Sequence, residues 1–340
     1  MAVKRCTTTS LPLSNLEVTM YKIVIDTMGS DKGPEMIVGG AALALKKHGE
    51  LEVCLVGDEG FLKSECEKQG LPMERVEILH APDVITNYDS PAAAIFGKPN
   101  SSLVVALKAL AERDDLVGLI NAGSTGALLA GAVRFLSTPE RTRPALAAVL
   151  PAADGSFTCL VDTGATIDCT ASQLLHFARL GRDFMRRLYG IEAPRIGLLS
   201  NGAEATKGNA LVKETHALLA AAEDINFVGN IEGTGALSGA CDVLVCDGFA
   251  GNQVLKVSEG IAKRIITDIV KYAKKCGRED YMQLVGHLVG LYDFNSLGGG
   301  IILGTKKTVI KAHGAANEAS IMNTSGMLLN LAKNKQVFET

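Results

Sequence analysis

Four short polar turns contain the residue types that could carry out chemistry. Each follows an apolar run typical of a buried strand and precedes a segment with helical periodicity; the turns span residues 26–31, 121–126, 200–209 and 247–252. Each offers backbone N–H groups at a helix start, beside small hydroxyl or amide side chains. Unpaired amides and the helix dipole both favour negative charge, so such turns suit a phosphate or an oxyanion. The four turns together predict an active site that handles anions.

The turn after the apolar run 243–246 is the centre of this prediction. Asp247 and Asn252 interrupt the apolar run there, before an apolar-periodic segment from Val254 to Ile265. In open parallel sheets, ligands lie outside the carboxyl ends of the strands, so both side chains are expected to face a substrate. A second interpretation stays open, in which Asp247 only caps the following helix.

Several familiar catalytic motifs are absent from the sequence. There is no GxxxxGK[ST] loop, Ser238 replaces the third glycine of a dinucleotide fingerprint, and Ser124 lacks the GxSxG frame. The histidines and cysteines show no zinc-ligand spacing, so no metal site is predicted. His313 follows a strand and could contact a ligand or make a structural hydrogen bond. Cys246 is interpreted as a buried packing residue rather than a nucleophile.

Length and composition restrict the class of protein. With 340 residues, the chain predicts one large α/β unit or two closely packed lobes. The net charge of −3 and the dispersed basic residues do not support nucleic-acid binding. The eight cysteines lie largely in or beside apolar runs, as expected for a protein of the reducing cytoplasm. No apolar run approaches the roughly 20 residues of a membrane-spanning helix.

The elements that must position the polar turns alternate between strand and helix. We expect a disordered leader over residues 1–19 and a single α/β/α catalytic domain over residues 20–334. Two apolar runs, 145–150 and 157–161, flank Asp154-Gly155 and predict an antiparallel hairpin, so the mostly parallel sheet should be mixed. The expected helices span residues 34–47, 59–69, 101–111, 127–135, 171–189, 210–222 and 317–331.

Residues 261–295 depart from this alternation. Basic residues and apolar residues occupy different faces at helical spacing, which predicts an amphipathic helical hairpin. Its apolar stripe comprises Tyr281, Leu284, Val285, Leu288, Val289 and Tyr292. The stripe could pack against a second copy of the chain, or the tip of the hairpin could enter a membrane surface.

Eight segments together resemble one known family. They are IDTMGSDKGPE, NAGSTGALLAG, RTRPALAAVLP, DTGATIDC, KGNALVKE, INFVGNIEG, DVLVCDGFAGNQVLKVSEG and IKAHGAAN, in order from about Tyr21 to Leu331. In these segments the chain is similar to the bacterial phosphate acyltransferases of phospholipid synthesis.

The resemblance implies both an activity and a fold. Such an enzyme transfers a long-chain fatty acyl group from acyl carrier protein, or sometimes coenzyme A, to inorganic phosphate, and the acyl phosphate formed enters glycerophospholipid synthesis. The implied fold is a three-layer α/β/α sandwich related to phosphotransacetylases and isopropylmalate dehydrogenases. The resemblance also implies a homodimer, no metal or redox cofactor, and a cytoplasmic enzyme with possible peripheral contact to anionic membrane.

Acyl transfer from a thioester to phosphate needs positioning and electrostatic stabilisation rather than an enzyme nucleophile. Lys207 is the candidate for binding phosphate and Asn252 for donating to the oxyanion, and both match family positions thought to be functional. Asp247 is expected to orient one of them. The remaining residues expected to line the anion pocket are Asp26, Gly29, Ser124, Thr125, Gly126, Gly208, Asn209, Gly251 and His313.

Two other enzyme classes remain as alternatives. A phosphotransacetylase-like enzyme that uses short acyl-CoA would share the fold and the chemistry. An NAD-dependent hydroxyacid dehydrogenase of the related fold would need a nicotinamide and grouped aspartates for a divalent metal, and the sequence has no such group.

Overall fold

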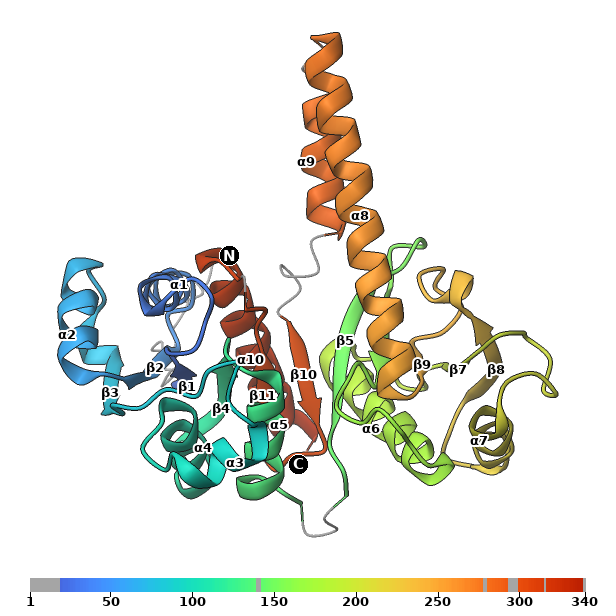
Figure 1. Cartoon of the computed structure of the whole chain (residues 1–340), viewed down its shortest axis with the longest axis horizontal. Coiled ribbons are helices and arrows are strands. Elements are labelled where there is room, and N and C mark those ends of the chain that lie inside the picture. Colours follow the sequence, from blue (N-terminus) through green and yellow to red (C-terminus); the bar gives the residue numbers. More distant parts are fainter. Residues whose placement is uncertain (1–18, 139–141, 278–279, 293–298, 315, 339–340) are drawn as a thin grey trace, which may run out of the picture.

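The computed structural model describes residues 19–138, 142–277, 280–292, 299–314 and 316–338. The expected leader therefore lies outside the described residues except for Thr19. Within them, eleven strands form one sheet in the order β3-β2-β1-β4-β11-β10-β5-β6-β9-β7-β8 (Figure 1). The strands are β1 Tyr21–Asp26, β2 Leu51–Gly57, β3 Val76–His80, β4 Leu116–Asn121, β5 Ala145–Pro151, β6 Phe157–Val161, β7 Ile196–Ser200, β8 Phe227–Glu232, β9 Val243–Val245, β10 Gly300–Leu303 and β11 Thr308–Lys311.

Helices cover both faces of the sheet, which explains the continuous apolar runs of its strands. In β1, Ile23 and Ile25 face one core and Val24 faces the other. The first face carries α1 Pro34–Lys47, α2 Glu59–Lys68, α6 Ala171–Tyr189, α7 Ala210–Ala221 and α10 Glu318–Phe338; the second carries α3 Pro91–Gly97, α4 Ser102–Glu112, α5 Thr125–Phe135 and α8 Gly248–Cys276. The predicted three-layer sandwich with a mixed sheet is confirmed.

The sheet consists of two parallel halves that run in opposite directions. Strands β3, β2, β1, β4 and β11 are parallel, as are β6, β9, β7 and β8, and the antiparallel strands β10 and β5 join the two sets. Residues that pair on neighbouring strands form one row across this junction: Ile310, Ile301, Ala147 and Val161. On one side β1, β4 and β11 end within one residue of this row, and on the other side β6 and β9 end at it. The turns that follow them therefore meet near the middle of the molecule.

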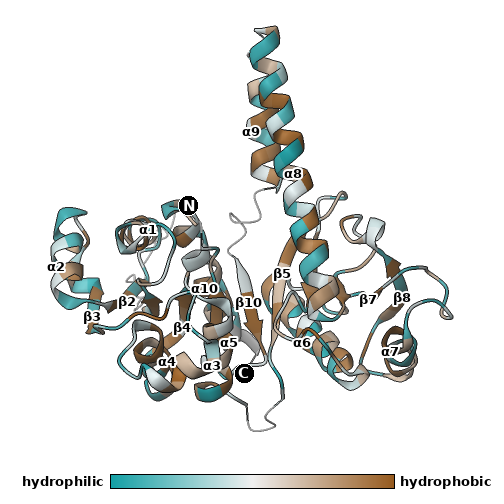
Figure 2. Cartoon of the chain, viewed as in Figure 1, coloured by the Kyte–Doolittle hydropathy of each residue, from teal (hydrophilic) through white to brown (hydrophobic). Residues whose placement is uncertain are grey.

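Helix α8 continues far beyond the sheet and forms a projecting hairpin with α9 Asp280–Tyr292 (Figure 1). The helix begins at Gly248, so the segment expected to start at residue 261 is continuous with the helix that follows β9. Apolar and polar segments alternate along both helices in Figure 2. Tyr281 packs edge-on against Tyr272, with ring centroids 5.7 Å apart, and Val285 is buried. Residues 278–279 and 293–298, at the expected tip and end of the hairpin, lie outside the described residues.

One helix was not anticipated from the sequence. The helices expected from the sequence do not include residues 91–97, yet these residues form α3. Pro91 occupies the first turn, where the missing N–H of proline has no helical partner to lose. This short helix lies beside α5 (Figure 1).

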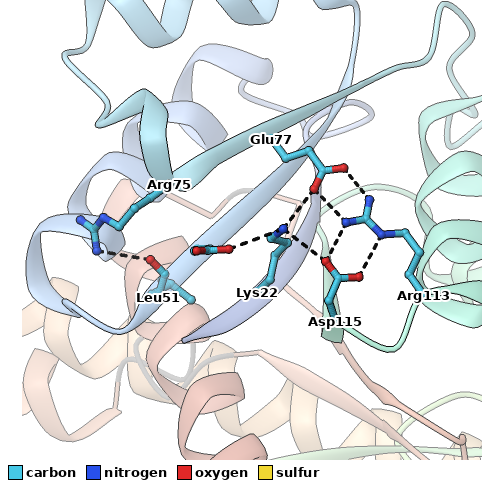
Figure 3. A network of polar contacts seen from close by, with 7 residues as sticks. Lys22, Leu51, Arg75, Glu77, Arg113 and Asp115 are labelled. Carbon is cyan, nitrogen blue, oxygen red and sulfur yellow. Dashed lines mark hydrogen bonds and ion pairs between the residues drawn. The ribbon is translucent and has the colours of Figure 1, made fainter. Parts of the chain in front are cut away.

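A network of charged side chains connects the beginnings of the strands in the N-terminal half (Figure 3). The Lys22 ammonium lies 3.3 Å from Glu77 and 3.2 Å from Asp115, and Arg113 bonds both carboxylates at 2.8 Å. A further carboxylate, that of Glu52, lies 3.5 Å from Lys22. The network links β1, β2 and β3 to the turn before β4. Its groups are partly exposed, so we expect a moderate contribution to stability.

We expect Glu77→Gln to weaken the fold in a pH-dependent way. Hydrogen bonding from Arg113 lowers the pKa of Glu77 below its ordinary value. A carboxyl with a lowered folded pKa stabilises the protein above its unfolded pKa, and that stability is lost as the pH falls through the folded pKa. Urea unfolding near pH 7 should show a loss of about 1 kcal/mol, which should shrink near pH 3. The exposed Glu74→Gln is the control, and an equal loss at both pH values would contradict the prediction.

Candidate active site

Two of the four predicted polar turns and the turn at His313 converge in the N-terminal half of the sheet. Asp26, buried at the end of β1, accepts hydrogen bonds from Met28 N at 3.1 Å and from Asn121 Nδ2, at the end of β4, at 2.7 Å. Burial raises the pKa of Asp26 to about 6. Gly29 has φ +78°, and a Cβ there would lie 3.4 Å from the Cα of Gly123. This contact brings the two turns together, and the Asp31 N–H donates to the carbonyl of Gly314 at 3.2 Å, which adds the His313 turn.

A cavity of about 440 Å³ opens where the two halves of the sheet meet; we call it the central cavity. It brings together Thr125, Asn252 and His313, three of the residues predicted from the sequence. Its other polar or glycine lining residues are Thr163, Gly164, Lys256, Glu259, Gly299, Gly300, Lys311 and Gly314. Residues from both parallel halves and from the bridging strands therefore form one site.

Asn252 is held at this cavity by the first turns of α8. Asp247 is the N-cap of the helix, and its carboxylate accepts the Ala250 N–H at 2.8 Å. A Cβ at Gly251 would lie only 1.9 Å from the carbonyl oxygen of Asp162, so glycine is required where α8 presses on the loop after β6. The Cβ of Asn252 lies 3.9 Å from the Cβ position of Gly164. The hydrogen bond that Asp247 makes in the structure is therefore the one expected of a helix cap.

Lys311 is a buried, charged residue of the central cavity that was not predicted from the sequence. It ends β11, is only 9% exposed, and its Nζ donates to the carbonyl of Ala312. Among the residues that the structure describes, no carboxylate lies within ion-pair distance of this ammonium. Burial lowers the pKa of Lys311 to about 8, although the charge of Asp31 opposes the shift. Because an unpaired buried charge is costly, the site is suited to an anionic ligand.

Of the other described groups at the central cavity, only the start of α5 adds positive potential to that of Lys311. The Lys256 ammonium is neutralised by Glu259 at 2.8 Å. Burial and the nearby Lys256 lower the pKa of His313, which favours its neutral form at neutral pH. Ser124 is the N-cap of α5 and Thr125 its first residue, so the positive end of the α5 dipole faces the cavity. Lys311 and this helix start provide positive potential from two directions.

Three other predicted residues lie at a different cavity, also of about 440 Å³, which we call the second cavity. Asp247, Gly208 and Asn209 line it. Asn209 is the N-cap of α7 and accepts the Val212 N–H at 2.9 Å, whereas Lys207 is exposed and lines neither cavity. The structure therefore divides the predicted set: Asn252 lies at the central cavity and Lys207 lies outside it.

Comparison with known proteins identifies the family. A family model described as "Fatty acid synthesis protein" matches residues 21–335. A phosphate acyltransferase from Halothermothrix orenii is 39% identical over 314 residues, which cover 89% of this chain and 92% of that protein. The chain belongs to the phosphate acyltransferase family. The predicted family and enzyme class are confirmed.

Solved structures support the fold of this phosphate acyltransferase. A phosphotransacetylase from Streptococcus pyogenes aligns with a TM-score of 0.65 at 16% identity, covering 94% of this chain and 96% of that one. A Salmonella typhimurium structure assigned as a 4-hydroxythreonine-4-phosphate dehydrogenase aligns with a TM-score of 0.53 at 16% identity, covering 91% and 99%. At such identities the likeness shows the fold alone, and the family match favours acyl transfer over the dehydrogenase alternative.

The position of Lys207 leads to a prediction for this phosphate acyltransferase. Because its side chain is exposed, Lys207→Ala should lower kcat/KM by about five-fold or less, the scale of a solvent-screened charge interaction. Lys213→Ala, another exposed lysine just after the start of α7, is the control. A selective loss of about 100-fold would mean that Lys207 moves to the reacting groups during turnover.

Proposed function

We propose that this phosphate acyltransferase moves a long-chain fatty acyl group from acyl carrier protein to inorganic phosphate in the central cavity. The acyl phosphate product would serve glycerophospholipid synthesis. The observation that carries the proposal is the buried Lys311 ammonium, which has no carboxylate partner among the described residues and lines the same cavity as Asn252. These are the two kinds of group that transfer of an acyl group to a phosphate anion requires.

The chemistry assigns one task to each group. Lys311 and the N-terminal end of α5 hold the phosphate dianion, and one of its oxygens attacks the thioester carbonyl carbon. The Asn252 amide donates to the carbonyl oxygen as negative charge develops on it. When the tetrahedral intermediate collapses, the carbon–sulfur bond breaks and the thiolate leaves. A thiol has a pKa near 8.5, so its departure needs little help from a general acid.

One assay tests the donor and the acceptor together. The protein is incubated with inorganic phosphate and palmitoyl acyl carrier protein, palmitoyl-CoA or acetyl-CoA, and acyl phosphate is trapped with hydroxylamine. Phosphate-dependent palmitoyl hydroxamate formed most efficiently from the carrier protein is the expected result. Preference for acetyl-CoA would instead favour the phosphotransacetylase-like alternative.

Exposed basic residues on α8 support an acidic carrier protein as donor. Lys263, Lys271, Lys274 and Lys275 are exposed on this helix. A second basic group, on α6, is less available, because Arg179 and Arg182 already bind Asp224 at 2.9 and 2.8 Å. We therefore place carrier-protein docking along α8, whose first turns line the central cavity.

The projecting hairpin supports assembly of this cytoplasmic enzyme as a homodimer that touches anionic membrane. Packing of α9 against α8 buries only part of the apolar stripe, because Leu284, Val289 and Tyr292 stay exposed. Leu291 of α9, outside the stripe, is exposed as well, as are Val257 and Ile261 on α8. Exposed apolar surface of this extent is typical of an interaction site. No helix in the described part of the chain is both long enough and apolar enough to cross a membrane.

A double substitution should separate the two roles of the hairpin. Leu284→Glu/Leu291→Glu places charge on exposed positions of α9, so the catalytic body should stay folded. We expect the variant to elute as a monomer in size-exclusion chromatography with light scattering, or to lose flotation with anionic liposomes while remaining dimeric. A monomeric wild type that does not float even at low salt would contradict both roles.

A further inference from the structure

A third cavity, of about 490 Å³, forms a groove between α3 and α5. Its lining is mainly apolar: Ala92 and Phe96 come from α3, Leu129, Ala130 and Val133 from α5, and Pro144 and Ala165 from loops, while Arg134 and Arg143 complete it. Phe96 is 68% exposed and Val133 is 49% exposed, so the groove presents unusually accessible apolar surface. We call it the α3–α5 groove.

Two walls of the groove adjoin residues that line the central cavity. On α5, Thr125 lines the central cavity, whereas Leu129 and Val133 line the groove. These residues are spaced by four and therefore follow one face of the helix. In the loop after β6, Gly164 lines the central cavity and the next residue, Ala165, lines the groove. In Figure 1, α5 lies near the middle of the molecule, with α3 beside it.

We propose that the α3–α5 groove binds the acyl chain of the donor. The proposal rests on the function proposed above and states where the chain lies while its carbonyl reacts in the central cavity. An alkyl chain needs only apolar contact, which this lining supplies. The pantetheine arm of the donor fits less well, because its amide groups would lose water in a groove whose main lining is alanine, leucine, valine and phenylalanine.

The distance from the central cavity to the far end of the groove agrees with this occupant, and so does the rim of the groove. Thr125 and Val133 are eight positions apart, a rise of about 12 Å along the helix. An extended chain of single bonds advances roughly 1.2 Å per bond, so this distance takes about ten carbons. The two charged lining residues are Arg134 and Arg143. The Arg134 guanidinium lies over the Phe96 ring, 3.9 Å from its centroid, and so covers apolar surface with its own side chain.

The test compares acyl donors of different length on variants that fill or charge the groove. In wild type, kcat/KM should rise from butyryl to decanoyl donors. Ala130→Phe should lower kcat/KM by about ten-fold or more for decanoyl and palmitoyl donors and by less than about two-fold for the butyryl donor. The control is Ala93→Phe, at an exposed α3 position that does not line the groove. Val133→Glu, at a half-exposed position, provides a second variant if Ala130→Phe does not fold.

The outcomes separate this inference from the proposed function. Two results would overturn the groove as the acyl site. In one, the variants form less phosphate-dependent acyl hydroxamate, and the loss is equal for all chain lengths. In the other, the variants fold and their kinetics are unchanged. An equal loss at all lengths would indicate the pantetheine arm instead. Failure of wild type to form acyl hydroxamate from any donor would overturn the proposed function as well. A loss confined to long donors, with Ala93→Phe unaffected, is the expected result.

Discussion

Lys311→Met should lower kcat/KM by about 10²–10³-fold, the effect of removing one preorganised charge-stabilising group. Methionine keeps much of the length and apolar stem of lysine, so the cavity wall should stay intact. The variant should also be at least as stable as wild type, since it removes a buried charge that has no carboxylate partner among the described residues. Enzyme assays and urea unfolding of the same preparation measure both effects.

The pKa of Lys311 gives this prediction a pH dependence. Burial lowers its pKa to about 8, below the unfolded value of roughly 10.4, so folding disfavours the ammonium. The free-energy cost of burying the charged ammonium is fully present below the folded pKa, and it disappears as the pH rises to the unfolded pKa. The stability gained by Lys311→Met should therefore be larger near pH 7 than near pH 10. In the wild type, KM for phosphate should rise above about pH 8 as the ammonium is lost.

Lys256→Met is the matched control, because Lys256 lines the same cavity but is exposed and already paired with Glu259. Its effect on kcat/KM should be far smaller. Wild-type turnover by folded Lys311→Met would exclude the proposed role of the ammonium.

Asn252→Ala should lower kcat by about 10²-fold or more, because it removes the amide that we assign to the developing oxyanion. Asn252→Asp should be slower still, since a carboxylate repels that charge. The turn itself should survive both changes, because the cap of α8 is provided by Asp247. Circular dichroism and steady-state kinetics at saturating phosphate are the measurements.

Gln253→Ala, at the exposed neighbouring position, is the control for these variants and should leave kcat nearly unchanged. If Asn252→Asp were more active than Asn252→Ala, the side chain at this position would act as a base or an orienting acceptor rather than as a donor. Equal activity of all three proteins would remove Asn252 from the mechanism.

Local sequence signals predicted most individual elements well. The expected helix over residues 34–47 coincides with α1, where proline opens the helix and basic residues close it. The predicted hairpin coincides with β5 and β6. These elements depend on periodicity and turn residues, which act over short distances. The sheet order depends on contacts between distant segments, and no local pattern reveals that β11 separates β4 from β10.

The candidate site was partly predictable for the same reason. Asn252, Thr125 and His313 follow strands and were expected at a ligand site, and they line one cavity. Lys207 also lies in a polar turn, but it lies outside the central cavity. Lys311 was overlooked because it lies inside an apolar strand rather than in a turn. Its signal was a lone lysine in the run VIKA, a position where burial of a charge calls for a functional explanation.

The position of β11 between β4 and β10 affects the order in which the chain can fold during synthesis. On the ribosome, β4 emerges almost two hundred residues before its partner β11, and β5 likewise precedes β10. Until both late strands arrive, the nascent chain carries two unpaired strand edges, which favour association with other chains. Helix α10, which packs on α1, arrives later still. The nascent protein should therefore depend on chaperones until its last segments leave the ribosome.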